Sequence, residues 1–260
     1  MPTSDIHVRG LAGIGDLGPG DDLAAILAES LNESAIAPAT GDILVVAQKA
    51  VSKVENRFAD LATVTPSDRA RILAEETRKD PRLVELILGE STHLVRARPG
   101  VLIVRHRNGY VMANAGIDAS NLVPGLGEQV LLLPEDADAS AARLRDALAR
   151  LTGVELGVVV SDSFGRPWRN GVTNVAIGAA GIPALLDRRN EKDRYGRTLE
   201  VTQVAVGDLL ASAAGLAMGE GDEGCPAVHV RGLPANYRGH PDRNIGAAGL
   251  IRPLEEDLFR

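Results

Sequence analysis

The stretch Val158-Val159-Val160-Ser161-Asp162-Ser163-Phe164-Gly165-Arg166 decides how this 260-residue chain is expected to fold. Its apolar half completes residues 156–160, the clearest predicted strand, and its polar half places Asp162 at the carboxyl end of that strand. Open α/β sheets bind ligands at that end. A carboxylate beside the Ser163 hydroxyl can hold a divalent cation, and the guanidinium groups of Arg166 and Arg169 suit carboxylates and phosphates. The alternative is a strand-end turn with surface arginines, and the pattern favours a functional site over it.

Strand and helix patterns continue on both sides of this stretch, without an internal repeat or a convincing linker. Strands are predicted at residues 6–11, 43–46, 101–104, 111–112, 130–133 and 227–230, with a hairpin turn at Asn108-Gly109. Helices are predicted to begin at Asp21, Thr65 and Asp80 and to cover residues 141–151 and 204–218, whereas residues 233–249 are predicted to be loop. We therefore expect an α+β or mixed α/β fold with mixed sheets. It would form a single domain over residues 1–260, or two interwoven subdomains.

Composition and charge exclude several classes of function. Acidic residues outnumber basic ones by 35 to 28 and the formal charge is −7, which argues against a nucleic-acid or anionic-membrane partner. Aromatic residues make up 3%, so a surface that stacks on nucleic-acid bases is not expected. Cys225 is the only cysteine, which rules out an intramolecular disulfide and fits a reducing cytoplasm. We expect a cytoplasmic protein without a membrane span or a signal segment.

Two lysines follow the predicted strand at residues 43–46. Lys49 and Lys53 are four residues apart and would share one face of a helix. A lysine near the start of a helix opposes the helix dipole, and that cost makes sense if an anion such as a phosphate chain lies there. The alternative, two solvated surface lysines, is favoured by this segment when it is taken alone.

Two further segments carry oxygen ligands. Residues 114–121 contain Asp118 and Asn121, whose side chains suit magnesium or manganese, although an Asx-type turn uses the same residue types. Residues 218–225 combine three glycines with three acids, and Glu220 could reach a metal there; a solvated acidic loop is the alternative. Cys225 has no sequence hint of a nucleophile pair and the five histidines lack metal-ligand spacing, so we expect none of them to act. The sequence has no Walker A loop and no dinucleotide fingerprint.

Taken in order, these segments resemble the coenzyme F420:L-glutamate ligase family, also called F420-0:gamma-glutamyl ligase. The resemblance covers almost the whole chain, because further segments match the family pattern. These are Val8-Arg9-Gly10-Leu11, Gly20-Asp21-Asp22-Leu23, Asp193-Arg194-Tyr195-Gly196-Arg197 and Val230-Arg231-Gly232-Leu233. Ser163 stands where many relatives have Thr, and both supply a hydroxyl. Asn56 stands where relatives often have Gly, and Asn tolerates a positive φ.

The resemblance implies a family-specific mixed α/β fold that works as a homodimer, without the flavin-reductase-like domain that follows in some bacterial relatives. It implies two divalent cations, manganese or magnesium, and a monovalent potassium ion is a further candidate. Asp118 and Asp162 would hold one divalent ion, and Ser163 and Glu220 would hold the other. The GTP site that it implies consists of Leu11, Ala12, Gly13, Ile14, Gln48, Lys49, Lys53, Asn121, Met218, Gly219, Glu220, Gly221, Asp222, Glu223, Gly224 and Cys225.

The chemistry that the resemblance implies is the GTP-dependent ligation of L-glutamate to the F420 precursor F420-0, with possible further gamma-linked glutamates. The precursor's carboxylate would become an acyl phosphate before the amine attacks, with release of GDP and phosphate. Lys53 is a catalytic candidate, and so are Arg166 and Arg169, one of which would grip a substrate carboxylate or phosphate. No general base is assigned. Two alternatives remain: another nucleotide-dependent carboxylate–amine ligase, and a non-catalytic regulator that binds GTP or metal.

Overall fold

The centre of the molecule is a mixed five-stranded sheet. The computed structural model describes residues 5–120, 128–238 and 245–257. The strand order is β1-β12-β2-β8-β9, with β1 at His7–Gly10, β12 at Ala227–Arg231, β2 at Ile43–Ala47, β8 at Gly157–Arg166 and β9 at Arg169–Ala180. Only the β2–β8 pair of this sheet is parallel. The prediction of a mixed α/β fold with mixed sheets is therefore confirmed.

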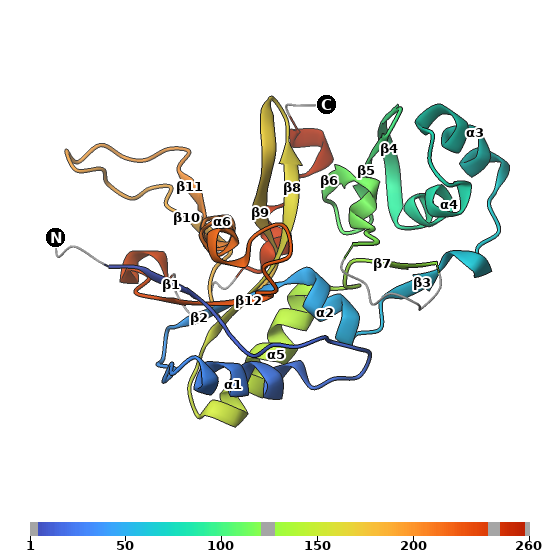
Figure 1. The fold of residues 1–260 in the computed structure, drawn as a ribbon. Coiled ribbons are helices and arrows are strands. Elements are labelled where there is room, and N and C mark those ends of the chain that lie inside the picture. The colour runs from blue at the N-terminus through green and yellow to red at the C-terminus, as the bar shows by residue number, and fades with distance from the viewer. Residues whose placement is uncertain (1–4, 121–127, 239–244, 258–260) are drawn as a thin grey trace.

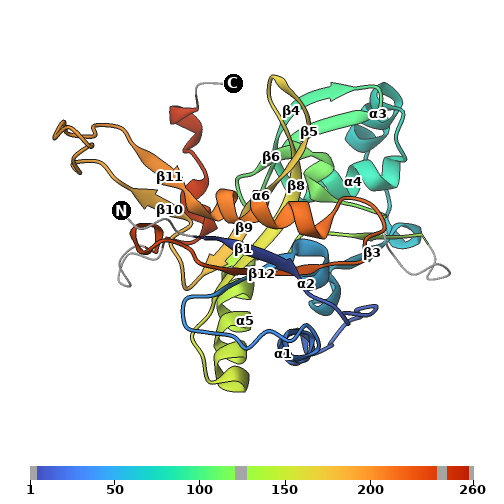
Figure 2. The same cartoon turned by 60° about the vertical axis from the view of Figure 1, so that its left-hand side comes forward.

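Helices cover both faces of this sheet (Figures 1 and 2). On one face lie α1 (Leu23–Glu33), α2 (Gln48–Val54) and α5 (Ala137–Thr152), and on the other lies α6 (Val206–Met218). Side chains alternate along each strand, so Val158 and Val160 pack toward α1 and α5, whereas Val159 packs toward α6. Because the chain has few aromatic residues, the core consists mainly of aliphatic side chains.

A smaller lobe stands beside the central sheet (Figure 1). It contains α3 (Asp68–Thr77), α4 (Pro81–Gly89) and a three-stranded sheet of β4 (Ser91–Arg98), β5 (Val101–His106) and β6 (Val111–Ala113). The helices and this sheet enclose their own aliphatic cluster. The short strands β3 (Phe58–Asp60) and β7 (Gln129–Leu131) connect the lobe to the rest of the chain, and β10 (Leu185–Asp187) pairs with β11 (Gln203–Ala205) in a projecting arm.

Four predicted details are corrected by the structure. Asp22, not Asp21, caps α1, because its carboxylate accepts the Ala25 N–H at 3.0 Å. Ser67, not Thr65, caps α3, since its hydroxyl reaches the Ala70 N–H. The last helix begins at residue 206, because residues 203–205 pair with β10. The described part of residues 233–249, predicted to be loop, includes 3-10 helices at Ala235–Tyr237 and at Ala247–Leu250, the latter running one residue past this range.

The most important difference from the predictions concerns β8, which carries Asp162. It does not end at Asp162 but continues to Arg166 and turns back as β9. Its parallel neighbour β2 does end there, since Ala47 pairs with Ser161. Asp162 is thus the first residue beyond the carboxyl end of the parallel pair, so the expected position for ligand binding is kept.

Within the described part of the chain, no helix combines the length and the apolar character that a transmembrane span requires.

Candidate functional site

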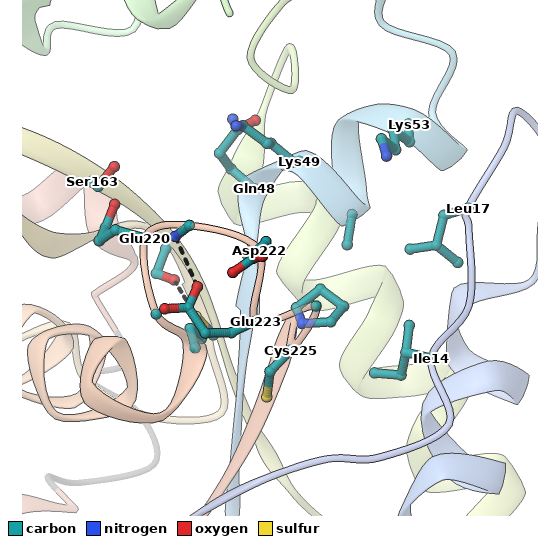
Figure 3. Close-up of a pocket in the computed structure, with 18 of the residues that line it drawn as sticks. Ile14, Leu17, Gln48, Lys49, Lys53, Ser163, Glu220, Asp222, Glu223 and Cys225 are labelled. Carbon is teal, nitrogen blue, oxygen red and sulfur yellow. Dashed lines mark hydrogen bonds between the residues drawn. The ribbon is translucent and has the colours of Figure 1, made fainter. Parts of the chain in front are cut away.

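A cavity of about 740 Å³ opens at the carboxyl end of β2, where Ser161, Asp162 and Ser163 of β8 continue past it (Figure 3). Its lining comes from five places in the sequence. They are residues 14–17, residues 47–50 with Lys53, residues 161–163, Asn174, and residues 218–226. The volume is that of an ordinary small-molecule site, for which roughly 300–1,000 Å³ is typical.

The order of the strands explains why these segments meet. Strand β12 lies between β1 and β2 and is antiparallel to both, so its start lies beside their ends. Backbone hydrogen bonds fix this arrangement: Leu11 donates to the Ala227 carbonyl at 2.9 Å, and Ala47 donates to the Pro226 carbonyl at 2.8 Å. The loop before β12, the segment after β1 and the start of α2 therefore border one space, and β8 adds its polar residues beside β2.

Both lysines of α2 line the cavity, although this segment taken alone favoured two solvated surface lysines. Figure 3 shows Lys49 at the start of the helix and Lys53 one turn later. The Lys49 ammonium lies 2.6 Å from Oδ2 of Asp118 and 2.6 Å from Oγ of Ser120. Asp118, in the loop after β6, is thereby joined to the cavity through Lys49.

Asp162 and Ser163 point to opposite faces of the sheet. The extra residue of the β-bulge near this point, Ile177, belongs to β9, so the alternation along β8 continues. Ser161 contacts Met218 of α6, which puts Ser163 on the α6 side and Asp162 on the α2 side. Ser163 accordingly shares its side of the cavity with Glu220, which follows α6 (Figure 3). The two implied ligand pairs, Asp118 with Asp162 and Ser163 with Glu220, stay a prediction.

The charges around Asp162 are those of a cation site. Burial, helped by the nearby Asp118 and Glu220 carboxylates, raises the pKa of Asp162 to about 7, although the Ser163 N–H and Lys49 act in the opposite direction. Burial would also raise the pKa of Asp118, but hydrogen bonds from Lys49 and Ser120 outweigh it and hold this pKa below its ordinary value. A carboxylate that resists ionisation among other carboxylates gains most from a bound cation. The residues present therefore fit the implied divalent ions.

Side chains of this chain would complete an ion's coordination only in part. Among the described residues, no three His, Cys, Asp or Glu side chains lie close enough together to form a metal-ligand group. Each implied ion would have two protein ligands. Three of these four side chains are carboxylates, and the fourth is the Ser163 hydroxyl. Substrate oxygens or water would supply the rest, which is usual for magnesium sites.

The three acids of the loop at residues 218–226 have different roles. The Glu223 carboxylate accepts the Gly221 N–H at 2.8 Å. Its carboxyl carbon would lie only 2.1 Å from a Cβ built on Gly219. Backbone N–H groups of this loop hold the pKa of Glu223 below its ordinary value. Gly219 has a φ of +73°, a backbone conformation that favours glycine. Glu223 shapes the loop, whereas Glu220 and Asp222 are exposed.

Several predicted site residues lie outside the cavity lining. Leu11, Ala12 and Gly13 precede the lining residues at 14–17. Arg166 and Arg169 lie at the β8–β9 turn, where Arg166 donates to the Asn170 carbonyl at 3.3 Å. The candidate nucleotide contact at position 121 is outside the described residues.

Asn174 lines the cavity and was missed by the sequence argument. It is the cross-strand partner of Ser163, so both side chains share one face. A Cβ on Gly215 of α6 would lie 2.2 Å from Oδ1 of Asn174, so glycine here leaves room for the amide in its present position. A glycine inside an apolar helix costs about 1 kcal/mol of stability relative to alanine. Gly215 was therefore the sequence signal that another group approaches this helix closely.

Comparison with known proteins gives the family. The model of the F420-0:Gamma-glutamyl ligase family matches residues 13–232, which include every segment of the cavity lining. The chain belongs to the F420-0:gamma-glutamyl ligase family. This family membership confirms the resemblance described above and makes the protein a ligase that forms carbon–nitrogen bonds.

Relatives named coenzyme F420:L-glutamate ligase align with this family member over most of their lengths. The protein of Methanopyrus kandleri is 50% identical over 243 residues, which cover 93% of this chain and 92% of that protein. The protein of Methanothermobacter thermautotrophicus is 46% identical over 255 residues, or 98% and 99% of the two chains. The protein of Natronomonas pharaonis is 47% identical over 254 residues, or 95% and 92%.

Proposed function

We propose that this protein joins L-glutamate to the coenzyme F420 precursor F420-0 through an amide bond, with GTP as the energy source. The observation that carries the proposal is the position of Asp162. It lies within β8, just beyond the end of its pairing with β2, between the Lys49–Asp118 pair on one side and the Ser163–Glu220 side on the other. The relatives' names supply the substrates, and the cavity volume suits a nucleotide.

The reaction requires activation, because a free carboxylate is a poor acyl donor. The terminal carboxylate of the precursor would attack the γ-phosphorus of GTP, which breaks the bond to GDP and forms an acyl phosphate. The glutamate amine would then attack the carbonyl carbon, lose a proton and expel phosphate. Lys49 and Lys53 would offset the charge of the phosphates, and Arg166 or Arg169 would grip a substrate carboxylate or phosphate.

The nucleotide would lie along the segments that line the cavity and the residues beside them, from Leu11 to Ile14, Gln48, Lys49, Lys53, Asn121 and residues 218–225. Manganese or magnesium ions held by Asp118 with Asp162, and by Ser163 with Glu220, would neutralise phosphate oxygens during transfer. The ion pair between the Lys49 ammonium and Asp118 supports this assignment only in that the Asp118 carboxylate already accepts a positive partner. Potassium stays a further candidate ion.

A homodimer belongs to the same proposal. The outer face of α6 supports it, because Leu209 is 56% exposed and Leu216 is 92% exposed on this helix. The two leucines are seven residues apart and therefore share one face of the helix. Large aliphatic side chains left in water on one helix face are typical of a subunit interface.

Mass spectrometry of the product tests the reaction. Purified protein is incubated with F420-0, L-glutamate, GTP and manganese, and parallel samples omit one component or replace GTP with ATP. We expect a mass increase of one or more glutamyl units that requires GTP and glutamate, with GDP and phosphate as co-products. Two results would refute the proposal: release of phosphate without addition of glutamate, or product that forms with ATP but not with GTP. Binding of GTP without glutamate-dependent phosphate release would instead identify a regulator.

A further inference from the structure

Asn174 brings a side-chain amide to the cavity that the proposed reaction does not yet use. It is the cross-strand partner of Ser163, and both side chains lie on the face of the sheet that α6 covers. Its Oδ1 lies on that side, because a Cβ on Gly215 of α6 would be 2.2 Å from this atom. The backbone carbonyl of Asn174 accepts the Ser212 hydroxyl at 2.8 Å, whereas among the described residues none forms a hydrogen bond with the amide itself. The amide is therefore available to a ligand.

The Ser163–Glu220 side of the cavity can accommodate further oxygen ligands around a cation. Ser163 and Glu220 would supply two, whereas magnesium takes about six. Glu223 of the same loop is not a candidate, because backbone N–H groups already hold its carboxylate. An amide oxygen is a hard ligand that suits magnesium and manganese. Cross-strand partners have Cβ atoms about 5 Å apart, so the Ser163 hydroxyl and the Asn174 oxygen can reach one ion at bond lengths of about 2.1 Å.

A β-bulge decides that Asn174, and not its neighbour Val175, lies across from Ser163. Ile177 is the extra residue of this bulge, so the β8–β9 pairs on its two sides differ in register by one residue. If Ile177 were paired like the other residues, Val175 would lie across from Ser163, and Asn174 would lie across from Phe164. Phe164 packs on the other face of the sheet, in the cluster that α1 and α5 cover. The bulge therefore aims Asn174 into the cavity.

Two polar side chains from other parts of the chain hold the backbone of this bulge. The Tyr110 hydroxyl, from the turn before β6, donates to the Ile177 carbonyl at 2.6 Å. The Asp208 carboxylate, from the first turn of α6, accepts the Ala176 N–H at 2.9 Å. Burial raises the pKa of Asp208, and this N–H offsets the rise only in part. A partly buried carboxylate is stabilised through its hydrogen bonds, so Asp208 and the bulge depend on each other.

Helix α5 also packs closely on the bulge. A Cβ on Gly178, the residue after Ile177, would lie 2.2 Å from the Ala137 carbonyl oxygen of α5. A shift of β9 by one residue would bring Ile177 or Ala179 to this position, where a side chain does not fit unless α5 moves. The register that aims Asn174 is thus fixed by packing as well as by hydrogen bonds.

We propose that the Asn174 amide oxygen is a third protein ligand of the cation at Ser163 and Glu220. Tyr110 and Asp208 are positioning residues for this ligand, because they hold the bulge that aims it. The inference rests on the proposed function, since the cation belongs to that reaction. It gives one cation site three oxygen groups, from β8, from β9 and from the loop after α6.

Side chains of nearly equal shape test the ligand. Asn174→Leu removes both polar atoms, whereas Asn174→Asp keeps an oxygen and adds a charge. Manganese is titrated by calorimetry into protein saturated with GDP, with matched free GDP in both solutions, and two ions should bind. One of them should bind at least about tenfold more weakly in Asn174→Leu and no more weakly in Asn174→Asp. The matched controls, Asn170→Leu and Asn170→Asp at the exposed end of the same strand, should change neither affinity.

A second set of variants tests the positioning. Asp208→Asn keeps an acceptor for the Ala176 N–H and should bind manganese like the unchanged protein. Asp208→Leu removes that acceptor, and Tyr110→Phe removes only the hydroxyl that holds Ile177. Each of these two should weaken binding of the same manganese ion by up to about tenfold. In the Asn174→Leu background neither should weaken it further, because their effect passes through Asn174. A purely structural role would lower the melting temperature without this dependence on Asn174.

Three outcomes would overturn the inference. The first is unchanged binding of both ions in Asn174→Leu; weaker GDP binding in that variant would then make the amide a donor to phosphate. The second is a single bound ion in the unchanged protein. The third is a further loss of manganese affinity when Asp208→Leu is added to Asn174→Leu. If a leucine variant does not fold by circular dichroism, Asn174→Ala and Tyr110→Phe carry the same tests. Unchanged protein that binds both ions but adds no glutamate would refute the proposed function instead.

Discussion

Replacing Asp162 by asparagine should stabilise the metal-free protein while abolishing its proposed activity. The pKa of Asp162 is about 7 in the fold, against an ordinary value of 3.8, because burial disfavours the carboxylate. Each pH unit of that difference corresponds to about 1.4 kcal/mol, so the ionised carboxylate costs at most about 4 kcal/mol of unfolding free energy. Asparagine removes this cost and still accepts the Ser163 N–H, which now lies 2.9 Å from Oδ1 of Asp162.

The pH dependence of this effect has a definite sign. Below about pH 4 the carboxyl is protonated in both the folded and the unfolded chain, so Asp162→Asn should change the free energy of unfolding little. Between about pH 4 and pH 7 only the unfolded chain releases the proton, so the unchanged protein loses stability relative to the variant. Above about pH 7 the difference is complete.

Urea unfolding with a chelator, at about pH 4 and about pH 8, measures this difference. Asp16→Asn is the matched control, because Asp16 lines the same cavity but is exposed, and it should change the stability little at either pH. Manganese should raise the melting temperature of the unchanged protein and not that of Asp162→Asn, which should also have no turnover. The reasoning is wrong if Asp162→Asn is no more stable than the unchanged protein at about pH 8, or if manganese stabilises both equally.

Three further predictions concern other parts of the structure. Lys49→Gln removes the ammonium that lies 2.6 Å from Asp118, and calorimetry should show about 10- to 100-fold weaker GTP binding; unchanged affinity would exclude Lys49 from the nucleotide site. Gly215→Ala forces the Asn174 amide from its place and should lower the free energy of unfolding by about 1–3 kcal/mol in urea titrations. Adding Asn174→Ala should restore most of that loss, and a failure to do so would contradict the close contact. Leu216→Lys should convert a dimer to monomers in light scattering, and a variant that stays dimeric would place the interface elsewhere.

Much of the local structure was predictable from the sequence. The cap at Asp80, the hairpin around Asn108-Gly109 and the buried strand at Ile43–Ala47 all occur as expected, because caps, turns and apolar runs are decided by neighbouring residues. Element ends were less predictable. Asp21 and Asp22 are both good caps, and only the orientation of the chain entering α1 selects Asp22.

The candidate site was predictable as a set of residue types but not as an arrangement. Glu220, Asp222 and Glu223 look alike in sequence, yet the fold turns Glu223 onto the backbone of its own loop. Asn174 carried no local signal, since its role depends on being the cross-strand partner of Ser163 and on the space above Gly215. Such pairings join residues far apart in the chain.

The sequence by itself determined the aliphatic core, the mixture of strands and helices, the family membership and the acidic and basic groups available for chemistry. These follow from composition and from patterns within a few residues. Only the tertiary structure decided that β12 lies between β1 and β2, which brings three distant loops to one cavity. It also decided that Asp162 and Ser163 face opposite sides of one strand, because that depends on which helices cover each face of the sheet.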